Sequence, residues 1–255
     1  MNYKRIKKLR SKLKKKVVSS WSQISDPNLA EILCHKKFDC LTFDLEHGVF
    51  NIKDLSQLIR VSEKNKKPAL VRLPSKNLEL CRQILDAGAD GIIIPNIQNS
   101  FELKKIIDLN LLPPKGKRGV GFSRSNDFGK NFINYIKSKT SPIIIAMIEN
   151  KEGLKNIDEI LKVKNLDCIL IGPYDLSASM GVPGNFNNRK FKEAIKFIKL
   201  ECKKNQIPCG FHLIEPNYKK LNKLAKEGFK FIPYSTDAYI ISNAVENMFK
   251  KDSKK

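Results

Sequence analysis

The stretch 143-IIIAMIEN-150 is apolar for six residues and then changes at once to an acid and an amide. A strand exposed on one face alternates apolar and polar residues, whereas a strand covered by helices on both faces is apolar throughout. The run Ile143–Ile148 therefore predicts a buried parallel strand, and we expect Glu149 and Asn150 at its carboxyl end.

Seven further runs of this kind lie along the chain, separated by longer segments with a helical period. The predicted strands are Val17–Trp21, Cys40–Leu45, Ala69–Leu73, Gly91–Pro95, Ile143–Ile148, Cys168–Ile171, Cys209–Leu213 and Phe231–Pro233. The predicted helices are Pro27–His35, Ile52–Asn65, Leu78–Ala87, Ser100–Leu109, Gly153–Val163, Asn188–Asn205, Tyr218–Glu227 and Ala238–Phe249. This alternation is typical of a closed barrel, so we expect a single α/β domain over residues 1–255, a (β/α)8 TIM barrel. A doubly wound open sheet is the alternative, but no Gly-rich fingerprint follows the first strand.

The bulk composition suits one such domain in the cytoplasm. A length of 255 residues is ordinary for a barrel, and 41% hydrophobic residues can build its core. No apolar run approaches the roughly 18 residues that a membrane span needs, and no apolar signal core follows the basic start of the chain. The six cysteines are scattered without a CxxC pair, so neither a zinc-thiolate site nor a disulfide framework is expected.

The net charge of +22 has two interpretations. It can attract an anionic partner such as nucleic acid or a membrane surface, or it can reflect lysines on solvated faces. The lysines are spread along the chain, apart from a dense run from Lys4 to Lys16, and aromatic residues are not interleaved with them for base stacking. We therefore expect solvated faces, no specific nucleic acid partner, and a basic N-terminal extension over residues 1–16.

In such barrels the working groups lie at the carboxyl ends of the strands. Four polar residues of different chemistry fall there: His47 after the second predicted strand, Arg72 in the third, Glu149 after the fifth and Asp175 after the sixth. His212, in the seventh strand, is expected to face the same rim. Chance can place one or two such residues there, but four indicate a site.

Each of the four also has an ordinary structural interpretation. Glu149 and Asp175 can cap helices. Arg72 can pair with an acid on the rim, and His47 can be a structural hydrogen-bonding group. Together they suit catalysis, because two carboxylates with room for water suit Mg2+ or Mn2+. An arginine can neutralise an oxyanion, and a histidine can move a proton near neutral pH.

At these residues the sequence resembles the HpcH/HpaI aldolase family, which includes 4-hydroxy-2-oxoheptanedioate aldolases and 2-keto-3-deoxy-L-rhamnonate aldolases. The resemblance extends from about Trp21 to Phe249, and several motifs occur in the family's order and spacing. These motifs are 38-FDCLTFDLEH-47, 71-VRLP-74, 85-LDAGADG-91, 118-RGVG-121, 148-IENKEG-153 and 171-IGPYDLS-177.

The resemblance implies a barrel of the phosphoenolpyruvate/pyruvate-binding type and a metal-dependent, class II aldolase. Such an enzyme cleaves or forms the C3–C4 bond of a 4-hydroxy-2-oxo acid, with pyruvate and an aldehyde as the products of cleavage. Glu149 and Asp175 are expected to hold Mg2+, Mn2+ or Co2+, with no further cofactor. Arg72 is expected to stabilise the enolate, His47 to take the proton of the 4-hydroxyl, and Asp86 to raise the basicity of that histidine. No lysine lies in a predicted strand, so a Schiff-base mechanism is not expected.

The substrate contacts are expected around the two metal ligands. The residues concerned are Arg72, Met147, Gly172, Pro173, Tyr174, Asp175 and His212. Met147 stands where the family often has a glutamine that contacts substrate, and Tyr174 stands where the family commonly has a small residue. These two departures bear on the substrate and the activity more than on the fold.

The resemblance also implies a homo-oligomer, a trimer or hexamer, whose other partners are a small-molecule oxo acid and an aldehyde. A C-terminal helix at about 238–249 is expected to pack on a neighbouring subunit, and Asp44 to approach the adjacent site. Two other functions stay open. One is a citrate-lyase-β-like or malyl-CoA-lyase-like carbon–carbon lyase on the same fold, which needs a CoA-binding surface. The other is a catalytically weak barrel that binds an anionic ligand or a polyanion.

Overall fold

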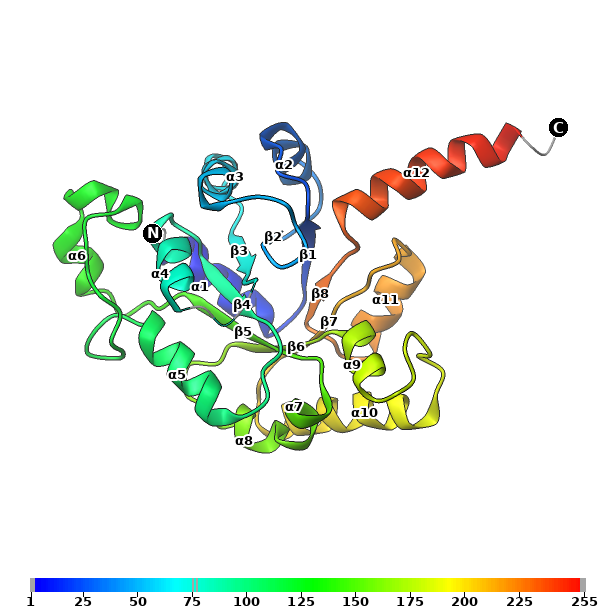
Figure 1. The fold of residues 1–255 in the computed structure, drawn as a ribbon. Coiled ribbons are helices and arrows are strands. Elements are labelled where there is room, and N and C mark those ends of the chain that lie inside the picture. Colours follow the sequence, from blue (N-terminus) through cyan, green and yellow to red (C-terminus); the bar gives the residue numbers. More distant parts are fainter. Residues whose placement is uncertain (1–2, 75, 77, 253–255) are drawn as a thin grey trace.

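The computed structural model describes residues 3–74, 76 and 78–252. Eight parallel strands close into a barrel in sequence order (Figure 1). They are β1 (Val17–Ser22), β2 (Cys40–Asp44), β3 (Ala69–Arg72), β4 (Gly91–Ile94), β5 (Ile143–Ile148), β6 (Cys168–Ile171), β7 (Cys209–Phe211) and β8 (Phe231–Pro233). The predicted (β/α)8 TIM barrel is confirmed, and every predicted strand is present with its ends shifted by at most two residues.

Helices surround the barrel. They are α2 (Pro27–Cys34), α3 (Ile52–Lys64), α4 (Leu78–Asp86), α5 (Ser100–Asn110), α6 (Phe132–Ile136), α7 (Lys151–Lys155), α8 (Ile157–Leu161), α9 (Pro173–Ser179), α10 (Arg189–Lys204), α11 (Tyr218–Lys226) and α12 (Asp237–Asp252), with the 3-10 helix η1 (Arg124–Gly129) before α6. Across the described residues, no helix combines the length and the apolarity that a membrane crossing requires.

After β1, the helices differ from the prediction in two respects. The segment Gly153–Val163, predicted as one helix, is divided into α7 and α8 at Asn156, whose backbone has φ −94° and ψ 13°. The Asn156 side-chain amide donates to the carbonyl of Gln98 at 2.9 Å, which ties the break to the preceding loop. Helices α6 and α9 were not predicted, because five and seven residues are too few to show a helical period.

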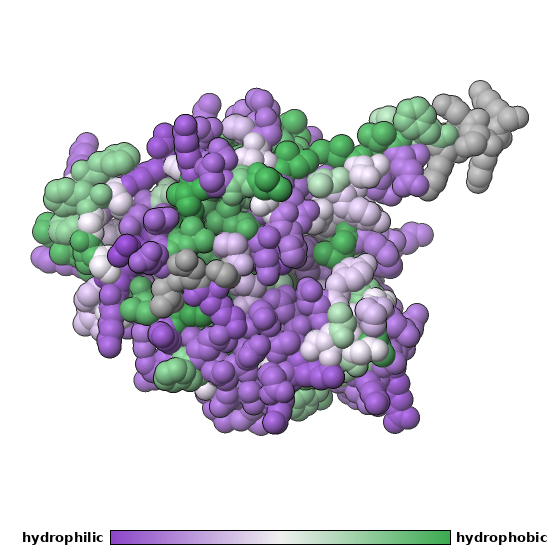
Figure 2. Space-filling view, in the orientation of Figure 1, coloured by the Kyte–Doolittle hydropathy of each residue, from purple (hydrophilic) through white to green (hydrophobic). Residues whose placement is uncertain are grey.

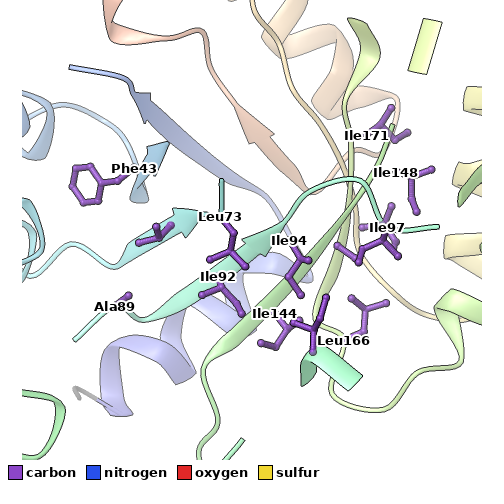
Figure 3. Close-up of a cluster of buried hydrophobic side chains, with 14 of the residues drawn as sticks. Phe43, Leu73, Ala89, Ile92, Ile94, Ile97, Ile144, Ile148, Leu166 and Ile171 are labelled. Atoms are coloured by element: carbon purple, nitrogen blue, oxygen red, sulfur yellow. The ribbon is translucent and has the colours of Figure 1, made fainter. Parts of the chain in front are cut away.

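Both faces of the strands are buried, as their continuous apolar runs predict. Outward-pointing side chains such as Ile92, Ile144 and Ile171 pack in one layer against the helices (Figure 3). Inward-pointing side chains such as Ile93 and Ile145 form a second cluster inside the barrel. Because successive residues of a strand point to opposite faces, this alternation also decides which polar residues enter the barrel.

The basic start of the chain folds into α1 (Tyr3–Leu13), which the sequence analysis did not predict as a helix. Ile6, Leu9 and Leu13 are buried and join the apolar cluster inside the barrel. Their spacing places them on one helical face, and burying each contributes about 2 kcal/mol. The segment 1–16, expected as an extension, thus closes the amino-terminal mouth of the barrel and leaves most of its lysines exposed.

Candidate active site

A buried ion pair lies at the carboxyl ends of β2 and β3. The register of these strands places Asp44 beside Arg72, and both side chains enter the barrel, with 0% and 5% exposure. Arg72 donates from Nε to Oδ1 at 2.7 Å and from Nη2 to Oδ2 at 2.6 Å. Trp21 Nε1 also donates to Oδ2, at 3.0 Å. This two-point geometry fixes the plane of the guanidinium.

The pair is ionised. Burial alone would raise the pKa of Asp44, but the hydrogen bonds and positive charge of Arg72 outweigh burial and lower that pKa below its ordinary value. Burial likewise opposes the charge of Arg72, but Asp44 and then Glu46 hold the pKa of Arg72 above its ordinary value. The site therefore contains a permanent positive charge with a fixed orientation.

The remaining edge of the guanidinium contacts a second acid. Arg72 Nη1 lies 2.7 Å from Oε2 of Glu46, in the turn after β2. Burial raises the pKa of Glu46, and the charges of Asp44 and Asp175 raise it further, whereas Arg72 and His47 lower it. The Glu46 carboxyl thus experiences both the positive guanidinium and the negative charges of neighbouring acids.

Glu149 follows β5 and is 7% exposed. Its Oε1 accepts the backbone N–H of Asn96 at 2.6 Å. Burial raises the pKa of Glu149 to about 7, and the negative charges of Asp175 and Glu46 add to the effect. The Asn96 bond and the charge of Arg72 lower the same pKa but do not cancel the rise. Burial and the negative charges of Asp175 and Glu46 therefore disfavour the ionised form of Glu149.

Helix α9 carries the second predicted ligand. Gly172 follows β6 as the N-cap of α9, Pro173 is the first residue of the helix, and the exposed Asp175 lies in its first turn. A Cβ on Gly172 would stand 2.7 Å from Glu149 Oε2, so the absence of a side chain there keeps that oxygen approachable. Tyr174 is 45% exposed, and its ring packs edge-on against Phe186 with centroids 5.0 Å apart.

The residues around Glu149 fit a divalent cation of the oxygen-preferring kind. The donors are carboxylates, Gly172 leaves space at Oε2, and a cation would offset the burial and negative charges that raise the pKa of Glu149. Over the described part of the chain, no three His, Cys, Asp or Glu side chains are grouped to hold a metal. Glu149 and Asp175 could therefore supply two ligands only, and water or substrate oxygens would complete the coordination.

The two histidines of the site differ in environment. His47 is exposed in the turn after β2, and its backbone N–H donates to Asp44 Oδ1 at 3.3 Å. His212 is 6% exposed, and its ring lies 4.3 Å from that of Trp21, whose side chain is inside the barrel. Burial, followed by the charge of Arg72, lowers the pKa of His212 to about 3, so its imidazole is neutral. Its Nε2 is buried without a hydrogen-bond partner among the described residues.

The remaining predicted residues lie in two places. Met147 is 1% exposed inside the barrel, one inward position below Glu149. Asp86 is the last residue of α4 and accepts from Arg118 Nη2 at 2.5 Å. Because α4 runs antiparallel to the strands, its last residue lies at the amino-terminal side of the barrel. Within one chain the structure therefore does not bring Asp86 to His47.

The sequence analysis expected Asp44 only near a neighbouring subunit's site, whereas here it is buried against Arg72 of its own chain, and Glu46 was not named as a site residue. Asp44 orients the arginine, and Glu46 occupies its free edge. A signal for Asp44 was present: it is an acid at the end of an apolar run, aligned with Arg72 at the end of the next. For Glu46 no pattern in the sequence indicated that the turn folds back over the guanidinium.

Comparison with known proteins identifies the family of the chain. The sequence model of the HpcH/HpaI aldolase/citrate lyase family matches residues 18–244. The chain is 27% identical over 238 residues to a 5-keto-4-deoxy-D-glucarate aldolase of Shigella boydii, with 92% of each chain covered. It is 28% identical over 239 residues to a 2-keto-3-deoxy-L-rhamnonate aldolase of Salmonella gallinarum, covering 91% of this chain and 88% of that one.

A solved structure is similar over nearly the whole fold. It is an HpcH/HpaI aldolase from Desulfitobacterium hafniense, 25% identical, with a TM-score of 0.90 over 98% of this chain and 96% of that one. The family match spans all eight strands except the first residue of β1, and it includes Arg72, Glu149 and Asp175. The chain therefore belongs to the HpcH/HpaI aldolase/citrate lyase family.

Proposed function

We propose that this chain is a metal-dependent carbon–carbon lyase, a class II aldolase that cleaves or forms the C3–C4 bond of a 4-hydroxy-2-oxo acid. Cleavage gives pyruvate and an aldehyde. The observation that carries the proposal is the buried Glu149, whose pKa is raised by burial and by the charges of Asp175 and Glu46, at the same mouth of the barrel as the oriented guanidinium of Arg72. A cation and an arginine aimed at one volume suit a reaction that develops negative charge on an oxygen.

Glu149 and Asp175 would hold the cation, Mg2+, Mn2+ or Co2+. A bound divalent cation polarises a carbonyl oxygen and stabilises negative charge on it. Since the pKa of Glu149 is raised to about 7, its carboxylate is ready to bind a cation above that pH and competes with protons below it. Cation affinity should therefore fall as the pH drops through 7.

Arg72 would stabilise the developing negative charge, and His47 would transfer the proton. Asp44 binds Nε and Nη2 of the guanidinium. Nη1, which contacts Glu46, would therefore approach the 2-oxo oxygen once Glu46 moves aside. His47, exposed at the mouth, would take the proton of the 4-hydroxyl during cleavage. No role at the mouth is proposed for Asp86, which pairs with Arg118.

The substrate would lie between α9 and the inside of the barrel. Gly172, Pro173 and the backbone around Tyr174 and Asp175 would contact its carboxylate. Met147 would line the floor with an apolar group. The His212 ring packs against Trp21, and in its neutral form it would line the side of the substrate site next to Met147. This apolar floor supports an acceptor aldehyde with little polarity where it meets Met147.

We also propose that the protein is a homo-oligomer, a trimer or hexamer. Helix α12 projects away from the barrel (Figure 1). Hydrophobic residues gather along it (Figure 2), and Tyr239, Ile241, Val245 and Met248 are 42% to 67% exposed. A helix in this position can bury these side chains against a neighbouring subunit.

A cytoplasmic location belongs to the same proposal. All six cysteines are free and buried, and none is bonded to another. Free cysteines of this kind suit a reducing compartment.

The test is exchange at the methyl group of pyruvate. The protein with Mg2+, Mn2+ or Co2+ should catalyse deuterium incorporation from D2O, and a chelator should stop it. With a panel of aldehydes, product mass then identifies the acceptor. Absence of exchange with all three cations would reject the aldolase and leave the catalytically weak, anion-binding barrel.

The metal ligands are tested separately by calorimetry with Mn2+. Glu149→Ala should weaken binding by about a hundredfold or more, since even residues behind a ligand cost 10–100-fold. Glu152→Ala is the matched control, because Glu152 lies three residues later and is exposed. Unchanged affinity in Glu149→Ala would show that the cation binds elsewhere.

A further inference from the structure

A cavity of about 570 Å³ lies between α10 and α11, outside the barrel wall. Phe211, His212 and Leu213 all line this cavity; Phe211 and Leu213 belong to the outer apolar layer, whereas the His212 ring packs on Trp21. Phe191 of α10 and Leu224 of α11 complete an apolar lining. Figure 1 shows α9, α10 and α11 together on one side of the barrel. The volume is within the 300–1,000 Å³ typical of sites for small molecules.

Lysines from both helices line the same cavity. Helix α10 contributes Lys192, Lys196 and Lys199, spaced by four and three residues on one helical face. Helix α11 contributes Lys220 and Lys223 from the opposite side. The charge of the lining is thus concentrated in two facing rows, one on each helix.

Part of this charge is already balanced. Two glutamates, Glu215 and Glu227, are the acids of the lining, and Lys220 pairs with Glu215. Lys199 Nζ lies over the ring of Phe229, 4.8 Å from its centroid. The side chains of Lys192, Lys196 and Lys223 form no ion pair with any residue that the structure describes, and they remain available to an anion.

We propose that this cavity is a second ligand site, which binds an organic anion with an apolar body and a carboxylate or phosphate group. The apolar body would pack against the aromatic lining, and the acid would lie between the lysines of the two helices. The +22 charge of the chain raises the local concentration of such a ligand without selecting it. Selection comes from the combination of an apolar floor and paired cationic walls.

Glu149 and Asp175 do not line this cavity, but three residues proposed to lie around the substrate, Pro173, Tyr174 and His212, do. Pro173 and Tyr174 line one end of the cavity, and the Tyr174 ring packs against Phe186, also in the lining. Asp175 is the next residue of α9. A bound anion would therefore contact the segment that carries a proposed metal ligand, although its binding requires neither the metal nor the aldolase reaction.

The test uses the full chain and 1-anilinonaphthalene-8-sulfonate, a probe that combines an apolar ring system with a fixed negative charge. Fluorescence titration should give one saturable site per chain. The Lys196→Glu/Lys223→Glu protein should bind the probe about tenfold more weakly or worse, because attraction becomes repulsion on both walls. The Leu224→Trp protein should also bind weakly, because it fills the cavity without changing any charge.

The matched control is Lys64→Glu/Lys155→Glu, which makes the same charge change at exposed lysines of α3 and α7. It should keep the affinity of the parent protein, and so should Glu149→Ala, which separates this site from the metal site. Phenyl phosphate or 3-phenylpropionate should displace the probe, and the stronger competitor identifies the preferred acid. Equal weakening in the control, parent-like binding in the Leu224→Trp protein, or displacement by uncharged benzyl alcohol would overturn the proposal.

Discussion

The two mouths of the barrel follow the same alternation of side chains but contain opposite chemistry. At the amino-terminal mouth, Ile6, Leu9 and Leu13 of α1 are buried among apolar strand residues. At the carboxyl-terminal mouth, Asp44 and Arg72 are equally buried and carry full charges. Burial by itself therefore does not separate core from site in this molecule.

The two mouths therefore depend on different contributions to the free energy of folding. Apolar burial stabilises the fold without involving protons. Buried charges stabilise it only when they are paired, and their contribution changes with pH. Substitutions at the amino-terminal mouth should therefore alter stability alone. Substitutions at the carboxyl-terminal mouth should alter stability, pH dependence and cation binding together.

The largest effect is expected from Asp44→Ala. The substitution leaves the guanidinium of Arg72 buried without its principal partner, which costs about 3–5 kcal/mol. Urea denaturation at pH 7.5 measures this loss in the free energy of unfolding. The control is Asp108→Ala, which breaks an exposed pair with Lys104 and should cost less than about 0.5 kcal/mol. Equal losses in the two proteins would mean that burial does not distinguish the pairs.

Leu9→Ala tests the other mouth. Leu9 is 2% exposed at the junction of α1 and the barrel, and truncating such a side chain costs about 2–5 kcal/mol. The same loss should be found at pH 5 and pH 8, and Mn2+ affinity by calorimetry should match that of the parent protein. A drop in Mn2+ affinity comparable to that of Glu149→Ala would show that the two mouths are not independent.

Unlike Asp44→Ala and Leu9→Ala, the Glu149→Gln substitution is expected to raise the free energy of unfolding when no metal is bound. The folded pKa of Glu149 is about 7, above the ordinary value of 4.5, so the folded chain holds a proton that the unfolded chain releases. This contribution is lost as the pH rises from about 4.5 to 7. Without metal, Glu149→Gln should therefore be more stable than the parent by about 3 kcal/mol at pH 8 and by little at pH 4.5.

Saturating Mn2+ should reverse this order at pH 8. The cation stabilises only a protein that binds it, and the glutamine has lost a charged ligand. The measurement is thermal unfolding of both proteins with chelator and with Mn2+. A Glu149→Gln protein less stable than the parent at pH 8 without metal would contradict the crowding of carboxylates around this residue.

The sequence predicted the strands better than the helices, for a physical reason. A strand buried on both faces is apolar at every position, so Ile143–Ile148 stood out without any help from context. In α1, basic residues separate the buried Ile6, Leu9 and Leu13. The segment was therefore interpreted from its charge, and the helical spacing of its three apolar residues was not recognised. The charge that suggested a solvated extension belongs to the outer face of a helix that completes the core.

The candidate site shows the same limit. Arg72 and Glu149 could be placed at the mouth because the end of a strand can be recognised from consecutive residues of the sequence. The contact of Glu46 with Arg72 depends on how a turn folds back, and the burial of His212 depends on Trp21, far away in sequence. Features that need two distant segments at once are not visible in a single sequence.

The smallest effect is expected from His212→Leu, and its pH dependence is the informative part. Burial lowers the pKa of His212 to about 3, so the unfolded chain takes up a proton below pH 6.5 that the folded chain does not. Stability from this residue is therefore lost as the pH falls through 6.5 towards 3. Relative to the parent, His212→Leu should gain about 2 kcal/mol between pH 7.5 and pH 5.

At pH 7.5 the substitution itself should cost about 1 kcal/mol, because the ring loses its hydrogen bond with the Ser235 backbone, while the buried Nε2 has no partner to lose among the described residues. His212→Gln cannot take up a proton either, so it should show the same relative gain at pH 5 if titration is the cause. In the parent protein, Glu149 loses stability with rising pH over part of the range in which His212 gains it. These two pH dependences of stability offset each other in the parent protein, so each can be measured only in a variant that lacks the other residue's titration. If neither His212 variant gains stability at pH 5, the charged mouth does not hold a neutral imidazole and the contrast between the two mouths is weaker than described.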